Sequence, residues 1–204
     1  SLPIFSTVLR KQSRIFESKY RIDMNDQLGG QIDLRQLFDT CSSLESINAS
    51  SFHGAATARD THVLCVLIGS PSFSDDEAES AAREAGLAAG FLSTWRKHGA
   101  AAPSRVRGAY SVVIVDASKK AVFMAVDRFA IQTLCYCIDG HKLTFSDRAD
   151  CVEGRGTDLD PQAIFDYLFF HMIPAPRTIF RNVRRIPAAH SLLIDEKGVQ
   201  EIRH

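Results

Sequence analysis

The alternation of apolar and polar residues along the chain predicts a protein built mainly of short strands. Alternation occurs in residues 2–9 and 14–24, and a hairpin is predicted where residues 52–58 and 61–69 flank the polar pair Arg59-Asp60. The second strand of this hairpin is almost wholly apolar, so we expect both of its faces to be covered and the strand to be central in a sheet. Further strands are predicted at residues 109–115, 121–126, 133–138, 142–146 and 190–194, with turns at 116–120 and 139–140.

Three segments have the composition and spacing of helices. Residues 32–44, after a break at Gly29-Gly30, predict a short helix, and residues 74–99 predict one or two alanine-rich helices. A third helix begins at Asp160-Pro161, because proline is tolerated where the amide hydrogen would be unpaired, and it ends near Met172. One face of this helix carries Ile164, Tyr167, Leu168 and His171. Many strands with separate helical segments predict two sheets between helical layers.

Composition narrows the class of protein. The chain has 204 residues, which fits one domain over residues 1–204, and its 45% hydrophobic and 24% charged residues are typical of a folded globular protein. Its 24 basic and 24 acidic residues cancel, so no overall field favours nucleic acid or a membrane surface. No apolar run approaches the about 20 residues of a membrane-spanning helix.

Cysteine and histidine spacing predicts neither a disulfide framework nor a metal site. There are five cysteines, and Cys65, Cys135 and Cys137 lie in apolar strands, as expected for buried, reduced thiols in a cytoplasmic protein. Cys135 and Cys137 should share one face of their strand. The seven histidines show no metal-site spacing and no phosphate-binding loop motif occurs, so we expect no metal and no cofactor in this domain.

A series of motifs follows in a fixed order along the second half of the chain. They are Gly108-Ala109-Tyr110 with Asp116, the run from Asp127-Arg128 to Tyr136, Phe145-Ser146-Asp147-Arg148, and a closing set of Leu159-Asp160, Tyr167-Leu168, Pro174, Thr178-Ile179-Phe180, Val183, Ile186-Pro187 and His190. By these motifs the chain, from Arg105 onward, resembles the N-terminal glutaminase domain of asparagine synthetases. The resemblance implies a class II glutamine amidotransferase with the α+β, αββα fold of Ntn hydrolases, two mainly antiparallel sheets between helical layers.

The resemblance fails at the positions that carry glutaminase chemistry. The family begins with a cysteine whose thiol attacks the glutamine amide and whose α-amino group is the base, whereas this chain begins with Ser1. The asparagine of the family's oxyanion hole is replaced by Ile68, although the glycine that follows remains as Gly69. Loss of one such donor costs about 100- to 1,000-fold in rate. The aspartate that receives the glutamine ammonium group falls near Leu87. We therefore predict no catalytic residue, with Ser1 and Gly69 as vestigial candidates.

These replacements favour a glutaminase-like domain that is inactive as a glutaminase and belongs to an asparagine-synthetase-type protein. The resemblance implies a partner, an ATP-binding synthetase domain of the same chain or of a partner subunit, as in β-lactam synthetases and lasso-peptide cyclases. A homodimer is also compatible with the sequence. Two other functions stay open. Serine is a workable N-terminal nucleophile, so Ser1 could serve an active amidohydrolase, and a pocket under Gly69 could serve a stand-alone binding module.

A basic cluster lies between the last helix and the strand at residues 190–194. It contains Arg177, Arg181, Arg184 and Arg185. Such a cluster is either a solvated face or a docking surface for a partner domain or an anionic ligand. We expect Arg181, Arg184 and Arg185 to project outward and to form the interface with the synthetase domain.

Overall fold

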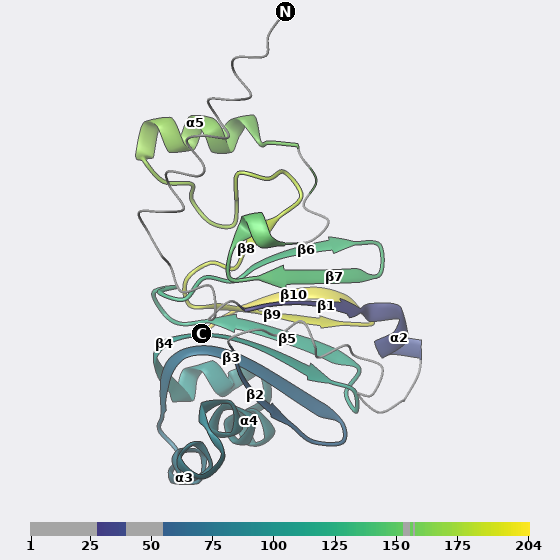
Figure 1. The fold of residues 1–204 in the computed structure, drawn as a ribbon, viewed down its shortest axis with the longest axis vertical. Coiled ribbons are helices and arrows are strands. Elements are labelled where there is room, and N and C mark those ends of the chain that lie inside the picture. Colours follow the sequence, from purple (N-terminus) through teal and green to yellow (C-terminus); the bar gives the residue numbers. More distant parts are fainter. Residues whose placement is uncertain (1–27, 40–54, 153–155, 157) are drawn as a thin grey trace, which may run out of the picture.

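Two antiparallel sheets form the centre of the molecule in the computed structural model, which describes residues 28–39, 55–152, 156 and 158–204. The larger sheet has six strands in the order β10 (Gly198–Arg203), β9 (His190–Asp195), β5 (Ala121–Val126), β4 (Val106–Asp116), β3 (Val63–Phe73) and β2 (Ala56–Arg59). The smaller has four, in the order β1 (Gly29–Asp33), β7 (Lys142–Ser146), β6 (Cys135–Asp139) and β8 (Arg184–Arg185). Figure 1 shows the two sheets stacked face to face.

The predicted hairpin and the later strands are confirmed, but the placement of β3 differs from the expectation. β3 is not central, because only the edge strand β2 lies beyond it. The strands of the second half are divided between the two sheets. β4 and β5 pair in the large sheet, whereas β6 and β7 pair in the small one, so the chain crosses between sheets after β5. The strands predicted at residues 2–9 and 14–24 lie outside the described residues.

The segment around Gly29-Gly30 is a strand and not a break. In β1, Gly29 pairs with Ser146 and Gly30 with Phe145 of β7, so the backbone ladder of the neighbouring strand fixes a segment with little strand propensity of its own. The helix predicted to follow begins later than expected, at Leu34, because Ile32 and Asp33 belong to β1, and it is described as α2 (Leu34–Asp39). The predicted residues 40–44 lie outside the described residues.

Successive side chains of β3 point to opposite faces of the large sheet, and both faces are apolar, which explains the continuous apolar sequence of this strand. Leu64 and Val66 belong to the core between the two sheets, whereas Cys65 and Leu67 belong to a second core on the opposite face of the large sheet. Both faces of β3 are thus covered, as its sequence predicts.

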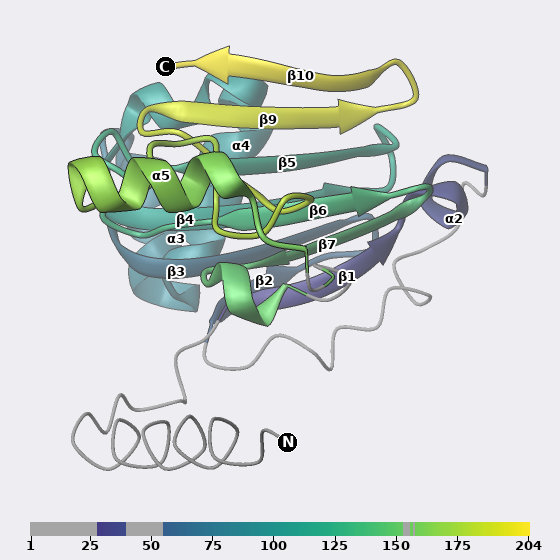
Figure 2. The ribbon, with the colours of Figure 1, turned by 90° about the horizontal axis from the view of Figure 1, so that it is seen from above.

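Two helices cover the outer face of the large sheet (Figures 1 and 2). They are α3 (Asp76–Ala85) and α4 (Leu87–His98), and a 3-10 helix, η3 (Gly99–Arg105), leads from α4 into β4. From α4, Phe91 packs with its ring centroid 5.4 Å from that of Tyr110, and the Trp95 centroid lies 4.6 Å from that of Phe123. Such aromatic pairs fix the helix layer on the sheet.

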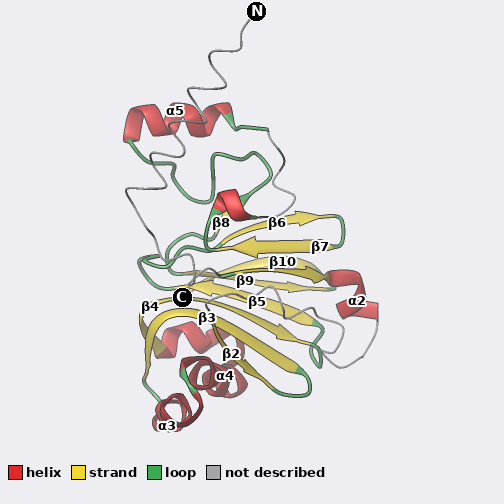
Figure 3. Cartoon of the chain, in the orientation of Figure 1, coloured by secondary structure: helices red, strands yellow, loops and turns green. Residues whose placement is uncertain are grey.

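The outer face of the small sheet is covered mainly by irregular chain. Cys135 and Cys137 share one face of β6, as predicted, and form a small apolar cluster with Val152 and Val183. Beyond this cluster lies α5 (Pro161–Phe170), which Figure 3 shows as a separate helix at the end of the molecule. The described residues thus form an α+β sandwich of two antiparallel sheets, with α3 and α4 on the large sheet and α5 beyond the small one, which confirms the predicted fold class. No helix among them is long and apolar enough to cross a membrane.

The boundaries of α5 agree with the sequence, and the structure shows which side of the helix is buried. The Asp160 carboxylate caps the helix by accepting a hydrogen bond of 3.0 Å from the amide of Gln162, and His171 ends it in the left-handed conformation. The buried residues of the helix are Ala163 and Asp166. The face with Ile164, Tyr167, Leu168 and His171 is exposed instead.

Candidate functional site

Gly69 is the vestigial site residue whose geometry the structure describes, because Ser1 lies outside the described residues. Gly69 pairs with Tyr110 of β4 and has φ of +105°, and a Cβ there would lie 2.2 Å from the carbonyl oxygen of Ala109. Gly108 lies on β4 two residues before Tyr110, in the same close approach of the two strands. Its φ is +91°, and a Cβ there would lie 2.5 Å from the carbonyl oxygen of Ser70. Only glycine fits either position, so Gly69 is required for the close approach of β3 and β4 whether or not it binds a substrate.

Ile68 is the residue that the resemblance aligns with the oxyanion donor of the family. Its side chain is 7% exposed and belongs to the core between the two sheets, opposite Ser111 of β4. A hydrocarbon side chain buried in this way offers no hydrogen-bond donor to a developing oxyanion.

Leu87 lies near the place, at Gly86-Leu87, to which the resemblance assigns the ammonium acceptor of the family. It is the first residue of α4 and packs, half-buried, against the core under the helices. The acid that precedes α3, Asp75, is held by two neighbours, with its carboxylate oxygens 3.1 Å from Nζ of Lys97 and 2.8 Å from Nε2 of His98. Leu87 itself offers no carboxylate for the α-ammonium group of glutamine.

A hollow of about 520 Å³ lies beside the place where β3 and β4 approach each other at Gly69 and Gly108. Four segments line this hollow: the end of η3, the start of β4, the turn after β5, and His204. The lining residues are Pro103 and Ser104 of η3, Val106, Arg107, Gly108, Ala109 and Tyr110 of β4, Arg128, Phe129 and Ile131 of the turn, and His204. Two guanidinium groups, those of Arg107 and Arg128, make this lining cationic. Burial lowers the pKa of His204 below its ordinary value of 6.5, so its imidazole is neutral at pH 7.

Asp127 lies directly before this turn, but its carboxylate is occupied. It is 1% exposed and accepts hydrogen bonds from three backbone amides, those of Tyr110 (3.3 Å), Phe129 (2.9 Å) and Gln132 (3.1 Å). It therefore shapes the turn after β5 and leaves the cations of the hollow available to an anionic group.

The three arginines expected at the interface differ in their surroundings. Arg181 and Arg184 are exposed. Arg185 does not project outward, because its guanidinium donates a hydrogen bond of 2.5 Å to the carbonyl oxygen of Ile173. Its backbone amide also donates to the carbonyl oxygen of Pro176, at 2.9 Å. Arg185 thus anchors the segment after α5.

A pocket under Gly69 was one of the alternatives that the sequence left open, but the residues that line the hollow were not predicted. Arg107, Arg128 and His204 belong to segments far apart in the chain, and no spacing signal connects them. The predicted vestigial residue Gly69 lies next to the hollow because it pairs with Tyr110, which lines it. Among the described residues, no group of three or more His, Cys, Asp or Glu side chains is arranged to hold a metal ion.

Comparisons with known proteins found similar solved structures and a similar sequence. Solved structures with a similar chain course include glutamine phosphoribosylpyrophosphate amidotransferase from B. subtilis, at 12% identity and a TM-score of 0.41 over 72% of this chain and 30% of that one. Another is a glutamine aminotransferase class-II domain protein from Silicibacter pomeroyi, at 10% identity and a TM-score of 0.42 over 72% of this chain and 70% of that one.

Sequence comparisons are more specific. Asparagine synthetase [glutamine-hydrolyzing] 1 of Bacillus subtilis (strain 168) is 24% identical over 110 residues, which are 53% of this chain and 17% of that protein. The chain thus spans a small part of the length of this relative. The pattern of the glutamine amidotransferase domain family matches residues 80–204, more than half of the chain. The chain therefore belongs to the glutamine amidotransferase domain family.

Proposed function

We propose that this domain does not hydrolyse glutamine and instead supports an ATP-dependent amide-forming domain, of the same polypeptide or of a partner subunit, in a cytoplasmic protein. The observation that carries the proposal is Ile68, which puts a buried hydrocarbon side chain beside Gly69, where the reaction needs a hydrogen-bond donor. Leu87, near the place of the ammonium acceptor, supports the same conclusion.

Glutaminase assays test the first part of the proposal. Purified protein incubated with glutamine should release no glutamate above background, and Ser1→Ala should change nothing. Ser1→Cys should not restore turnover, because the oxyanion donor and the ammonium acceptor are still missing. Turnover that Ser1→Ala abolishes would instead establish an active N-terminal-nucleophile amidohydrolase.

The gene that contains this chain tests the supporting role. Its reading frame, or that of a stable partner subunit, should encode an ATP-binding domain with an S-G-G-x-D-S pyrophosphate loop. If neither does, the supporting role is wrong.

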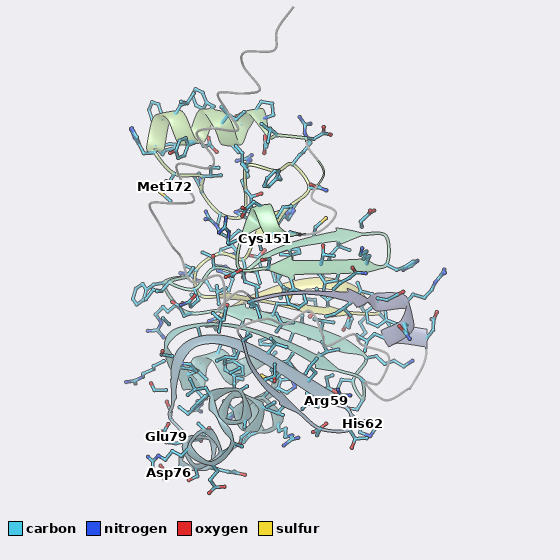
Figure 4. The ribbon with its side chains drawn as sticks, viewed as in Figure 1. Arg59, His62, Asp76, Glu79, Cys151 and Met172 are labelled. Carbon is cyan, nitrogen blue, oxygen red and sulfur yellow. The ribbon has the colours of Figure 1, made fainter. Side chains whose placement is uncertain are left out.

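The hollow beside Gly69 favours a second candidate function, a binding module for a small anion. Arg107 and Arg128 face this space together, and guanidinium groups bind carboxylates and phosphates with two parallel hydrogen bonds. Titration calorimetry with L-glutamate and with inorganic phosphate should then give binding that is weakened at least 10-fold by Arg107→Ala or Arg128→Ala. Arg59→Ala, on an exposed arginine of β2 that is labelled in Figure 4, is the matched control. Equal loss in all three variants, or no binding, excludes this function.

A further inference from the structure

The helix at the end of the molecule displays a large apolar surface. Eight residues, from 39% exposed for Ile164 to 72% exposed for Leu168, form what we call the α5 surface: Leu159, Ile164, Phe165, Tyr167, Leu168, Phe169, Phe170 and Met172. Figure 4 shows side chains projecting from α5 away from the sheets, with Met172 labelled beside the helix. Soluble monomers rarely expose contiguous apolar patches of more than a few hundred Å².

The α5 surface extends almost around the helix. At 100° per residue, the buried pair Ala163 and Asp166 occupies one narrow sector, and large apolar side chains occupy the rest. The aromatic rings contact one another, with Phe169 stacked 6.1 Å from Phe165 and edge-on 4.9 Å from Phe170. A helix that is apolar all round is normally enclosed by protein.

Polar contacts hold α5 in place. The carboxylate of Asp166 accepts a hydrogen bond of 2.7 Å from Nε2 of Gln162 and lies 3.6 Å from Nη1 of Arg177. The backbone amide of Asp160 donates to the carbonyl oxygen of Ile179 at 2.9 Å. Because these contacts use the narrow inner sector and the start of the helix, the apolar side chains are left available.

The size of the α5 surface matches a protein interface. A large side chain has roughly 200 Å² of accessible surface, so the exposed fractions of the eight residues amount to roughly 900 Å². A stable interface of standard size buries about 800 Å² on each partner.

We propose that the α5 surface inserts into an apolar groove of the ATP-dependent amide-forming domain. This inference rests on the proposed function. A second copy of α5 would cover one sector of the helix, whereas a groove can enclose residues on nearly opposite sides of it, such as Phe165 and Tyr167. Arg181 and Arg184, on the segment after α5, are exposed, so an acidic rim on the groove would complement them. The matched residues make up 17% of the Bacillus subtilis relative, so a member of this family can have a long further part in which such a domain can lie.

Hydrogen–deuterium exchange on the complete protein tests this proposal. Amides of residues 161–170 should exchange at least 10-fold more slowly in the complete protein than in the chain 1–204 alone. The double variant Leu168→Ser/Phe169→Ser should remove this protection. The matched control is Phe129→Ser/Ile131→Ser, which also replaces exposed apolar residues (76% and 64% exposed) but on the turn after β5, and it should leave the protection intact. Both variants should keep the melting temperature of the isolated chain, since all four side chains are exposed.

The outcomes separate the inference from the function on which it rests. Equally fast exchange of α5 in both forms of a protein that has an ATP-binding domain overturns the docking and leaves the proposed function standing. Absence of any such domain overturns both.

Two further experiments use the isolated chain and test other occupants of the α5 surface. Concentration-dependent dimers in analytical ultracentrifugation that Leu168→Ser/Phe169→Ser abolishes would make a second copy the occupant. Co-sedimentation with phosphatidylglycerol vesicles that the same variant abolishes would make it a lipid surface. Either result overturns the proposal.

Discussion

At the residue scale, glycines at positions 69 and 108 decide how β3 meets β4. Both have positive φ, and in both places a Cβ would press on a backbone carbonyl oxygen of the other strand. Backbone atoms cannot move away as a flexible side chain can, so the two strands would have to separate.

Gly69→Ala should therefore lower the free energy of unfolding by about 3 kcal/mol, from conformational strain together with the clash. Gly140→Ala is the control, because Gly140 also has positive φ (+58°) but meets nothing within 4 Å. It should cost about 1 kcal/mol, the strain alone. Urea denaturation of both variants measures the difference, and equal costs would contradict the clash.

Asp60 shows how one carboxylate stabilises a turn. Its Oδ1 accepts hydrogen bonds of 2.7 Å from the amides of His62 and of Val63, and its Oδ2 binds the guanidinium of Arg96. Partial burial alone would raise the pKa of Asp60, but these three partners outweigh it and hold the pKa below the ordinary value of 3.8.

A lowered carboxylate pKa stabilises the fold above the unfolded-state pKa, and this stabilisation is lost as the pH falls through the folded-state pKa. Asp60→Asn should thus reduce the free energy of unfolding at pH 7, and the difference from the parent protein should shrink as the pH falls below 3.8. Urea titrations at pH 7 and at pH 3 measure this. A difference that is the same at both pH values would show that the charge of Asp60 contributes nothing.

At the element scale, α5 and the segment after it are attached to the small sheet through β8. Arg184 pairs with Tyr136 and Arg185 with Cys135 of β6, so two adjacent arginines form the link. Their side chains behave differently, because that of Arg184 is exposed and that of Arg185 reaches the carbonyl oxygen of Ile173.

Arg185→Ala should lower the free energy of unfolding by about 1–3 kcal/mol, since it removes a charge-assisted hydrogen bond and leaves a part-buried carbonyl without its donor. Arg184→Ala, the matched control, should stay within about 0.5 kcal/mol of the parent protein. Urea denaturation distinguishes them, and small effects in both would mean that Arg185 does not anchor the segment.

At the scale of the whole molecule, the layers determine which thiols solvent can reach. Cys65 lies in the core under the helices, and Cys135 and Cys137 lie in the cluster outside the small sheet, whereas Cys151, labelled in Figure 4, is exposed. Burial raises the pKa of Cys135 to about 11 and raises that of Cys65 as well. The thiolate is the reactive form, so burial and the raised pKa act together.

Iodoacetamide at pH 8 should therefore alkylate Cys151 within minutes and leave Cys65 and Cys135 unmodified until the protein is unfolded in urea. Peptide mass spectrometry of the native and unfolded protein measures the labelling. Native labelling of Cys65 at the rate of Cys151 would contradict the layered structure.

Local sequence determined most of the elements. The hairpin of β2 and β3, the turns before β5 and after β6 and the two ends of α5 follow from alternation, turn residues, a cap and prolines, which act within a few residues. The proposed lack of an oxyanion donor and of an ammonium acceptor rests on residue identity at Ile68 and Leu87, so it is a prediction that the sequence makes by itself.

Tertiary structure decided what depends on contacts between distant segments. The ladder with β7 makes Gly29-Gly30 a strand against its own propensity, and β3 lies next to the edge because strand order is set by pairing. The hollow combines Arg107, Arg128 and His204, which no local pattern relates. In α5 apolar residues point in nearly every direction, so periodicity could not select the buried face. The polar contacts of Asp166 with Gln162 and Arg177 place the side of the helix with Asp166 inward, so the large apolar side chains are exposed.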